Sequence, residues 1–220
     1  MRVNDTIRVT PGSGATVATW VPGGSGTTEL QVVVLADATG HLYETKPTHF
    51  LSVPKITASA NRYHWELFNN SASTVTVAVH EIKAMVHTDV AVTGAVGVRF
   101  DFFRTTALSS GGTAGTYESS STLAANFARL DTNDSLISSG VSAKTVLTSI
   151  TTGAYLFTTL TFTEETNAAS NLHQGYNLLS DRPYTKPLTL RPGQGVAVRQ
   201  GTVASVGEIS WRLLLTTDPD

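Results

Sequence analysis

A period-2 alternation of apolar and polar residues near the C-terminus is the feature that most constrains this fold. In KPLTLRPGQGVAVRQGTVASVGEISWRLLLT (residues 186–216), the alternation occurs in three successive runs, and Pro192–Gly195 supplies a turn after the first. Such runs indicate antiparallel strands with one buried face. The first two runs are predicted to form a hairpin, and the third to follow as a further strand. The predicted core residues are Leu190, Val196, Val198, Ile209, Trp211 and Leu213.

The same alternation recurs in the middle of the chain. Residues 63–68 alternate before an Asn- and Ser-rich turn, and residues 75–79 return as the second half of another predicted hairpin. The apolar parity changes after His80, which predicts either a β-bulge there or a strand that passes between sheets. Residues 96–103 and 155–163 are typical of further strands. In the last of these, one side is expected to carry Leu156, Thr158, Leu160 and Phe162.

These segments predict an all-β protein. Roughly nine or ten strands follow one another at the spacing of a sandwich or barrel. We expect an antiparallel β-sandwich, jelly-roll-like, with long Gly/Ser/Thr-rich loops and at most one short helix. That helix is expected within residues 119–130, where the apolar spacing is helical at Leu123, Phe127 and Leu130.

No linker or tandem repeat divides the chain. Residues 1–220 are therefore expected to form a single β-sandwich domain, in which residues 1–28 are either integral or an extended N-terminal arm. The unbroken apolar run LQVVVLA (residues 30–36) predicts a strand in the middle of a sheet, with both faces covered.

The composition limits the classes of partner. The 220 residues include no Cys, which removes disulfides, thiolate zinc sites and cysteine nucleophiles. The net charge is -2, and the Lys and Arg residues are scattered, whereas a nucleic-acid binder would show a basic stripe. No apolar run approaches the roughly 18 residues of a membrane-spanning helix, and the N-terminus lacks a secretory signal. We expect a soluble protein with no direct nucleic-acid partner and no membrane partner.

Local motifs for enzyme chemistry do not occur in the sequence. There is no G-x-S-x-G elbow, P-loop, G-x-G-x-x-G fingerprint or H-E-x-x-H. Gly193–Gly195 is interpreted as a turn and not as a phosphate cradle, because a strand follows it. Glu164 and Glu165 are adjacent, which on a strand directs their carboxylates to opposite faces. We therefore expect no catalytic, cofactor-binding or metal-binding residues and no cofactor, while triads assembled from distant residues stay open.

Two patterns have both a ligand and a structural interpretation. Asp131–Ser135 begins like a calcium loop, but Leu136 stands where a glycine is needed, so a turn stabilised by Asp and Asn is favoured. His64 and Glu66 share a predicted strand face, which leaves a metal site assembled across strands conceivable, although a lone strand histidine is usually a surface or hydrogen-bonded residue. The six histidines are His41, His49, His64, His80, His87 and His173.

The C-terminal segments resemble those of a known family. PLTLRPGQGVAVRQGT (Pro187–Thr202), followed by SVGEISWRLLL (Ser205–Leu215), is similar to the C-terminal segment of structural proteins encoded by tailed bacteriophages. ELFNNSASTVTVAVHEIKAMV (residues 66–86) resembles the family's asparagine-turn hairpin, and VRFDFFRTTALSSGGTAG (residues 98–115) its strand before a Thr/Gly-rich insertion. The resemblance implies a β-sandwich or jelly-roll protein of the virion, on the head surface or in the tail, that acts by assembly. It implies no catalytic residue.

We therefore predict a non-enzymatic virion structural protein, a capsid decoration or head-associated protein. Its expected partners are the major capsid protein or other virion proteins, and it is expected to form a homo-oligomer, with a trimer as the first guess. The segment Arg104–Tyr117 is expected to be an exposed loop that contributes to these contacts, together with the N-terminal arm.

Two other functional classes stay open at this point. A sugar-binding module, lectin-like or receptor-binding, would use Trp20, Tyr63 and Trp65 to stack on saccharide rings. A β-fold hydrolase would assemble its site from dispersed Asp, Glu and His residues.

Overall fold

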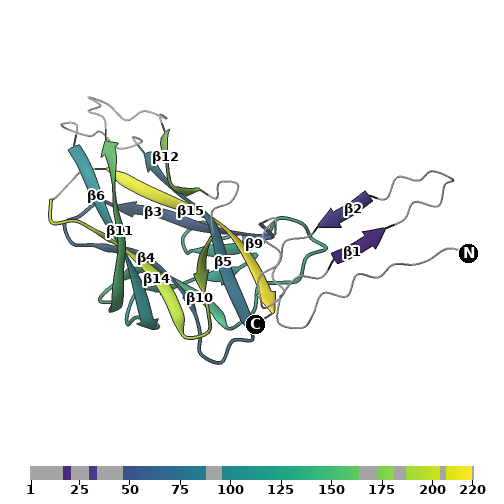
Figure 1. Cartoon of the computed structure of the whole chain (residues 1–220). Coiled ribbons are helices and arrows are strands. Elements are labelled where there is room, and N and C mark those ends of the chain that lie inside the picture. Colours follow the sequence, from purple (N-terminus) through teal and green to yellow (C-terminus); the bar gives the residue numbers. More distant parts are fainter. Residues whose placement is uncertain are drawn as a thin grey trace, which may run out of the picture. The chain divides into compact units, whose positions relative to one another are not determined.

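The computed structural model defines the architecture over most of the chain (Figure 1). It describes residues 17–20, 30–33, 47–87, 96–163, 173–180, 187–203 and 207–219. Within these ranges the regular structure consists of β-strands, with no helix. The chain divides into two units, residues 1–46 and residues 47–220.

The first unit contains a two-stranded antiparallel sheet. Strand β1 (Val17–Trp20) pairs with β2 (Leu30–Val33), with Val17 opposite Val33 and Trp20 opposite Leu30. Among the described residues β2 has one partner strand, which does not bear out the prediction that the run lies in the middle of a sheet, and residues 34–36 of the run lie outside the described residues. An unbroken apolar run indicates that a strand is to be covered, but it does not specify how many strands lie beside it. The role of residues 1–28 as an arm stays a prediction.

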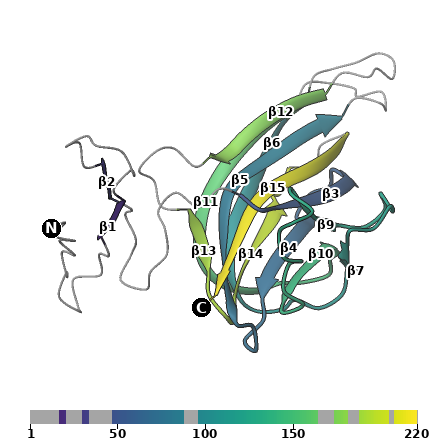
Figure 2. The ribbon, with the colours of Figure 1, turned by 90° about the vertical axis from the view of Figure 1, so that its right-hand side faces the viewer.

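The second unit is a sandwich of two sheets (Figure 2). The first sheet, called here the β4 sheet, has in spatial order β11 (Thr151–Thr163), β6 (Val96–Ala107), β14 (Gln194–Gln200), β4 (Tyr63–Asn69), β10 (Val141–Leu147) and β7 (Thr113–Ala114). The second, the β5 sheet, has β12 (His173–Ser180), β5 (Val75–His87), β15 (Glu208–Pro219), β3 (His49–Thr57), β9 (Asn126–Arg129) and β8 (Thr116–Tyr117), and β13 (Leu188–Leu190) also pairs with β5.

The pairing of the long strands is that of a jelly roll. β3 pairs with β15, β4 with β14, β5 with β12 and β6 with β11, and all four pairs are antiparallel. In chain order, the first of these strands pairs with the last, the second with the second-last, and so on inward. This is the nested pattern of one long hairpin rolled up into two sheets. The predicted all-β, antiparallel, jelly-roll-like sandwich is confirmed.

Both predicted hairpin turns form, but in neither case do the two strands that flank the turn pair with each other. Ser73 N donates to Asn70 O (2.9 Å) in the first turn, and Gln194 N donates to Arg191 O (3.0 Å) in the second. However, β4 and β5 lie in different sheets, and so do β13 and β14. Each turn therefore carries the chain across the sandwich. A period of 2 determines which face of a strand is buried, and two strands on opposite sheets can both direct that face to a common core.

The core lies between the sheets and is centred on aromatic rings. Trp211 of β15 makes edge-to-face contacts with Phe100 (4.8 Å between centroids) and Phe102 (6.2 Å) of β6 and with Trp65 (5.9 Å) of β4. These contacts join the two sheets directly. The predicted core residues are all fully buried, namely Leu190, Val196, Val198, Ile209, Trp211 and Leu213.

The parity change in β5 is a β-bulge, as one of the two alternatives predicted. In the pairing of β5 with β15, Leu214 lies opposite Glu81 and Leu215 opposite Val79, so the register skips His80. The extra residue shifts the alternation of side chains between the two faces of the strand by one position. Both apolar sets of the strand therefore face the core, Val77 and Val79 before the bulge and Ile82, Ala84 and Val86 after it.

The predicted helix within residues 119–130 is wrong. The segment ends in strand β9, which pairs with β3, and only Phe127 of the apolar triplet enters the core. Leu123 is 86% exposed and Leu130 is 54% exposed. A helix this short is marginal without an apolar face to bury, whereas pairing with β3 satisfies the backbone of residues 126–129.

We expect Leu213→Ala to lower the free energy of unfolding by about 2 to 5 kcal/mol, because it removes a fully buried side chain and leaves a cavity. Leu123→Ala makes the same chemical change at an exposed position and should change stability by about 0.5 kcal/mol or less. Urea unfolding of both variants measures the difference. Equal losses in the two variants would contradict the proposed core.

Candidate functional site

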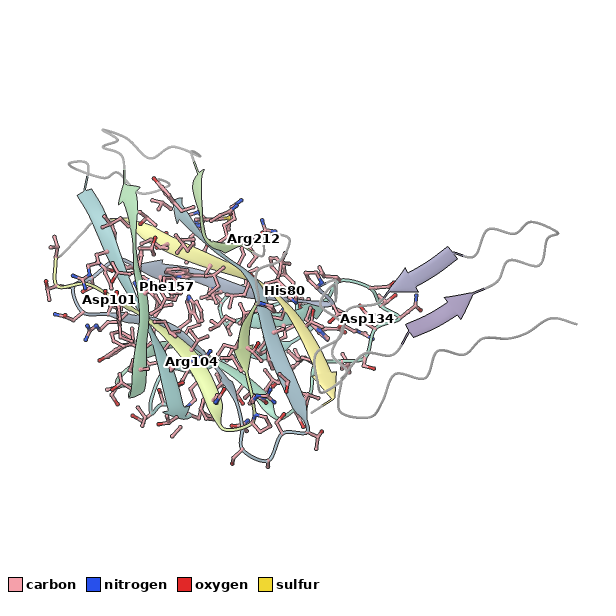
Figure 3. All side chains as sticks on the ribbon, in the orientation of Figure 1. His80, Asp101, Arg104, Asp134, Phe157 and Arg212 are labelled. Atoms are coloured by element: carbon pink, nitrogen blue, oxygen red, sulfur yellow. The ribbon has the colours of Figure 1, made fainter. Side chains whose placement is uncertain are left out.

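The polar residues that could have formed a site are spread over the sandwich, and each is described here with its contacts. Figure 3 shows Asp101 and Asp134 at opposite ends of the sandwich, with His80 between them. Among the residues that the structure describes, no group of three or more His, Cys, Asp or Glu side chains could hold a metal ion.

His64 is a buried, neutral member of a hydrogen-bond network. Its Nδ1 accepts a hydrogen bond from Trp211 Nε1 (3.3 Å), which leaves Nε2 to donate to Gln200 Oε1 (3.2 Å). The backbone N–H of Ser59 also donates to Gln200 Oε1 (2.9 Å). Burial, with a smaller contribution from the charge of Arg62, lowers the pKa of His64 to about 4 although the hydrogen bond with Gln200 opposes this shift. His64 thus satisfies the indole N–H at the centre of the core.

The predicted common face of His64 and Glu66 does not form. The register of β4 against β14 passes from Trp65–Val198 to Tyr63–Arg199, so His64 occupies a bulge. Its ring consequently joins Trp65 in contact with Trp211 on the core side. Because alternation is restored after the bulge, Glu66 lies on the other side of the sheet.

Glu66 fastens a loop across the outer side of the β4 sheet. The loop, residues 108–112, links β6 to β7, and these strands are separated in the sheet by β14, β4 and β10. Glu66 Oε2 accepts a hydrogen bond from Ser109 N (2.9 Å), and Lys144 Nζ donates to Ser109 O (2.7 Å). Glu66 and Ser109 are both buried as a result. The carboxylate therefore has a structural partner in the described fold.

The other described histidines are each hydrogen-bonded to the protein. His49 Nε2 donates to the carbonyl oxygen of Ser135 (2.9 Å). His80 Nε2 is bonded to Thr216 Oγ1 (2.8 Å), and His87 Nε2 to Ser210 Oγ (2.7 Å). These pairs belong to separate positions along β3 and β5. The side chains of His41 and His173 lie outside the described residues, as do Glu164 and Glu165.

The segment Asp131–Ser135 forms a turn, as the favoured interpretation predicted. Asp131 Oδ1 accepts a hydrogen bond from Asn133 N (2.9 Å), the bond by which Asp side chains stabilise turns. Arg129 Nη1 donates to the carbonyl oxygens of Thr132 (3.0 Å) and Asp134 (3.1 Å). A guanidinium thus holds the backbone of this turn through two of its carbonyl groups.

Arg129 also connects this turn to Glu118, which directly follows the segment Arg104–Tyr117. Arg129 Nη2 donates to Glu118 Oε2 (2.9 Å), and this hydrogen bond is the main cause that lowers the pKa of Glu118 below its usual range. The predicted loop Arg104–Tyr117 begins with four residues of β6 and also contains β7 and β8. Residues 110–114 are exposed as expected, whereas Ser109 is buried. Residues 106–108 and Tyr117 are also exposed, so the segment is largely exposed as expected, but it is not a single loop because strands occupy both of its ends.

The aromatic residues assigned to saccharide stacking are not available as a set. Trp65 is fully buried between Trp211 and Phe102. Tyr63 is half-buried, and the side chain of Trp20 lies outside the described residues. A ring inside the core cannot stack on a sugar, so Trp65 is excluded from such a site in this fold.

Strand β11 forms one edge of the β4 sheet and exposes large side chains. Tyr155 and Leu160 are each 53% exposed, and the ring of Tyr155 contacts that of Phe103 edge-to-face (5.8 Å). Phe157 instead stacks on Phe102 of the core (4.3 Å). The register with β6 shifts between Tyr155 and Phe157, so Leu156 packs against the core while Leu160 is exposed. The prediction that Leu156 and Leu160 share a side is wrong because of this bulge.

The charged side chains beside β11 on β6 and β14 form one ion-paired cluster. Asp101 forms ion pairs with Arg99 (Nε–Oδ1, 2.8 Å) and Arg199 (Nη2–Oδ2, 3.4 Å), and it also accepts a hydrogen bond from Thr158 of β11. Burial acts to raise the pKa of Asp101, but these hydrogen bonds outweigh it and hold the pKa below its ordinary value. Arg199 also lies over the Phe103 ring (5.0 Å). One carboxylate faces two guanidinium groups, so the cluster is ion-paired but keeps a net positive charge.

Comparisons of the chain with protein-family models, with curated proteins and with solved structures give no match. In the described part of the chain, no helix is long and apolar enough to cross a membrane. The fold and contacts define the class as a jelly-roll β-sandwich whose described histidines are held in hydrogen bonds within the fold.

We expect the stability of the protein to fall as the pH is lowered from about 6.5 to about 4, in part through His64. The unfolded chain binds a proton on this histidine near pH 6.5, whereas the folded protein does not until about pH 4. The shift corresponds to roughly 3 kcal/mol of stability lost across that window.

His64→Gln keeps an acceptor for Trp211 and removes the titration, so its stability should decrease less between about pH 7 and pH 4.5. Urea unfolding at both pH values measures the change, and the difference between wild type and variant should narrow by about 2 to 3 kcal/mol. Parallel pH profiles for the two proteins would show that His64 is not a buried neutral group.

Proposed function

We propose that this protein is a non-enzymatic structural component of a bacteriophage virion, a capsid decoration or head-associated protein that acts by assembly. Its partners are the major capsid protein or other virion proteins, together with further copies of itself. The observation that carries the proposal is the place in the fold of the segments that resemble phage structural proteins.

Those segments supply the inner strands of both sheets. Pro187–Thr202 contains β14, which lies between β6 and β4, and Ser205–Leu215 contains most of β15, which lies between β5 and β3. The resemblance therefore concerns the framework of the jelly roll and not a peripheral loop. Jelly rolls occur in viral capsid proteins, and this analogy at the level of the fold agrees with the resemblance.

The chemistry of the surface supports assembly. The chain has a net charge of -2 and only 15% charged residues, so copies repeated on a particle would repel one another weakly. His64, Glu66 and Asp131, the residues with a possible ligand chemistry, are engaged in the core, in the loop of residues 108–112 and in a turn. The large exposed apolar side chains on β11 are suited to contacts with another protein.

The sugar-binding alternative has weaker support. Jelly rolls also occur in lectins, so the fold does not separate the two functions. However, Trp65 lies in the core, which removes one of the three rings on which that alternative was based. Tryptophan fluorescence that shifts on addition of glycans would favour it over the structural role.

The proposal is tested by quantitative mass spectrometry of purified particles from the phage that encodes the chain. We expect the protein in a fixed ratio to the major capsid protein after gradient purification, because a decoration or head protein occupies repeated sites. A non-virion phage protein from the same lysate serves as the control for carry-over. Loss of the protein during purification, in parallel with that control, would contradict the proposal.

A further inference from the structure

We propose that β11 is an interface strand that pairs antiparallel with β11 of a second copy about a two-fold axis, so that the two β4 sheets form one continuous sheet. The inference specifies a surface and a partner, and it does not depend on the virion assignment. It rests on the length, composition and exposure of this strand.

The edges of the two sheets differ sharply in length. β7, the other edge of the β4 sheet, has two residues, and β8, an edge of the β5 sheet, also has two. At the remaining edge, β12 has eight residues and β13 has three, whereas β11 has 13. Among the described residues, β11 pairs only with β6, so its other side offers a long row of backbone N–H and C=O groups. Proteins often keep edge strands very short, which prevents pairing with other chains. β11 is long and lacks this protection.

The composition of β11 does not prevent pairing either. Its sequence, TTGAYLFTTLTFT, contains no Lys, Arg, Asp, Glu or Pro, the residues that usually protect an edge. It is instead rich in Thr and aromatic residues, which have high β-propensity. A bulge lies near Tyr155, but the register with β6 is regular from Phe157 to Thr163. A continuous stretch of the strand is therefore suited to pairing.

The exposed side chains provide an apolar contribution to the interface. Tyr155 and Leu160 are large, and each is 53% exposed in the single chain. Pairing along β11 would bring the same two residues of a second copy to this edge. Removal of their exposed apolar surface from water would favour association, in addition to the backbone hydrogen bonds of the new strand pair.

A second copy of the chain is the partner that these features fit. A two-fold axis places a strand antiparallel to itself, and pairs of Thr residues or of aromatic and β-branched residues across such strands are favourable. The strand itself carries no charged side chain that would select an acidic or basic partner, and the nearby Arg99 and Arg199 are both ion-paired with Asp101. The edge is therefore complementary to itself.

The first test introduces charge at the edge of the full-length protein. In Tyr155→Lys/Leu160→Lys, a two-fold pairing would bring like charges together, so we expect the dissociation constant of the dimer to rise at least tenfold. The matched control is Leu123→Lys/Leu136→Lys, at residues that are 86% and 60% exposed and lie away from β11. Light scattering and sedimentation over a range of concentrations report the mass against the 23.3 kDa chain.

Wild type and the control should associate while the β11 variant is a folded monomer, with circular dichroism confirming its strands. A wild type that is monomeric at all concentrations, or a β11 variant that associates as strongly as wild type, would overturn the proposal. Presence or absence of the protein in purified particles is measured separately, so failure here does not decide the virion assignment.

The second test uses the absence of cysteine from the chain. Single cysteines are placed in turn at positions 154–163 and oxidised under mild conditions. A two-fold antiparallel pairing brings one position opposite itself at a Cβ separation near that of a disulfide, so covalent dimers should peak there and fall off on both sides. Leu123→Cys should give few dimers. Uniform cross-linking across the scan and the control would indicate random collision and contradict a defined strand pair.

Discussion

The packing of Trp211 between the two sheets is the interaction on which the rest of the structure depends. The indole comes from β15, and the rings around it come from β4 and β6 in the opposite sheet. Its N–H would be a buried unsatisfied donor without His64, and His64 in turn is bonded to Gln200 of β14. The apolar contact therefore holds the sheets together, and the polar contacts around it favour one register over its neighbours.

The nested pairing explains how a long insertion is accommodated. Residues 108–147 enter after β6 and contribute strands to both sheets, with β7 paired with β10 in the β4 sheet and β8 paired with β9 in the β5 sheet. Glu66 and Lys144 fasten the start of the insertion through Ser109. The insertion thus gives each sheet a two-residue strand at one edge, and it leaves β11 at the opposite edge of the β4 sheet unprotected.

The polar residues that most suggested ligand or metal binding in the sequence have structural roles in the described part of the fold. His64 completes the core, Glu66 fastens a loop, and Asp131 caps a turn whose carbonyl groups are bound by Arg129. Among the described residues, the uncharged strand β11 pairs only with β6 and has no such role at its other edge. These polar residues are hydrogen-bonded within the fold, whereas β11 is an uncharged edge strand. Both features are consistent with the proposed role in assembly with further copies of the protein and with a particle.

The sequence by itself determined which residues of the uninterrupted alternating runs are buried, because period 2 assigns each residue of such a run to a face. Leu190, Val196, Ile209 and Leu213 were predicted on this basis, and the parity change at His80 located a bulge. Only the tertiary structure decided which strands pair, because a turn reverses the chain equally well within one sheet or between two. The bulges at His64 and near Tyr155 were also missed, since each changes the face of its neighbours without a break in the apolar pattern. Consequently, neither the neutral histidine beneath Trp211 nor the exposed edge of β11 could be derived from local alternation.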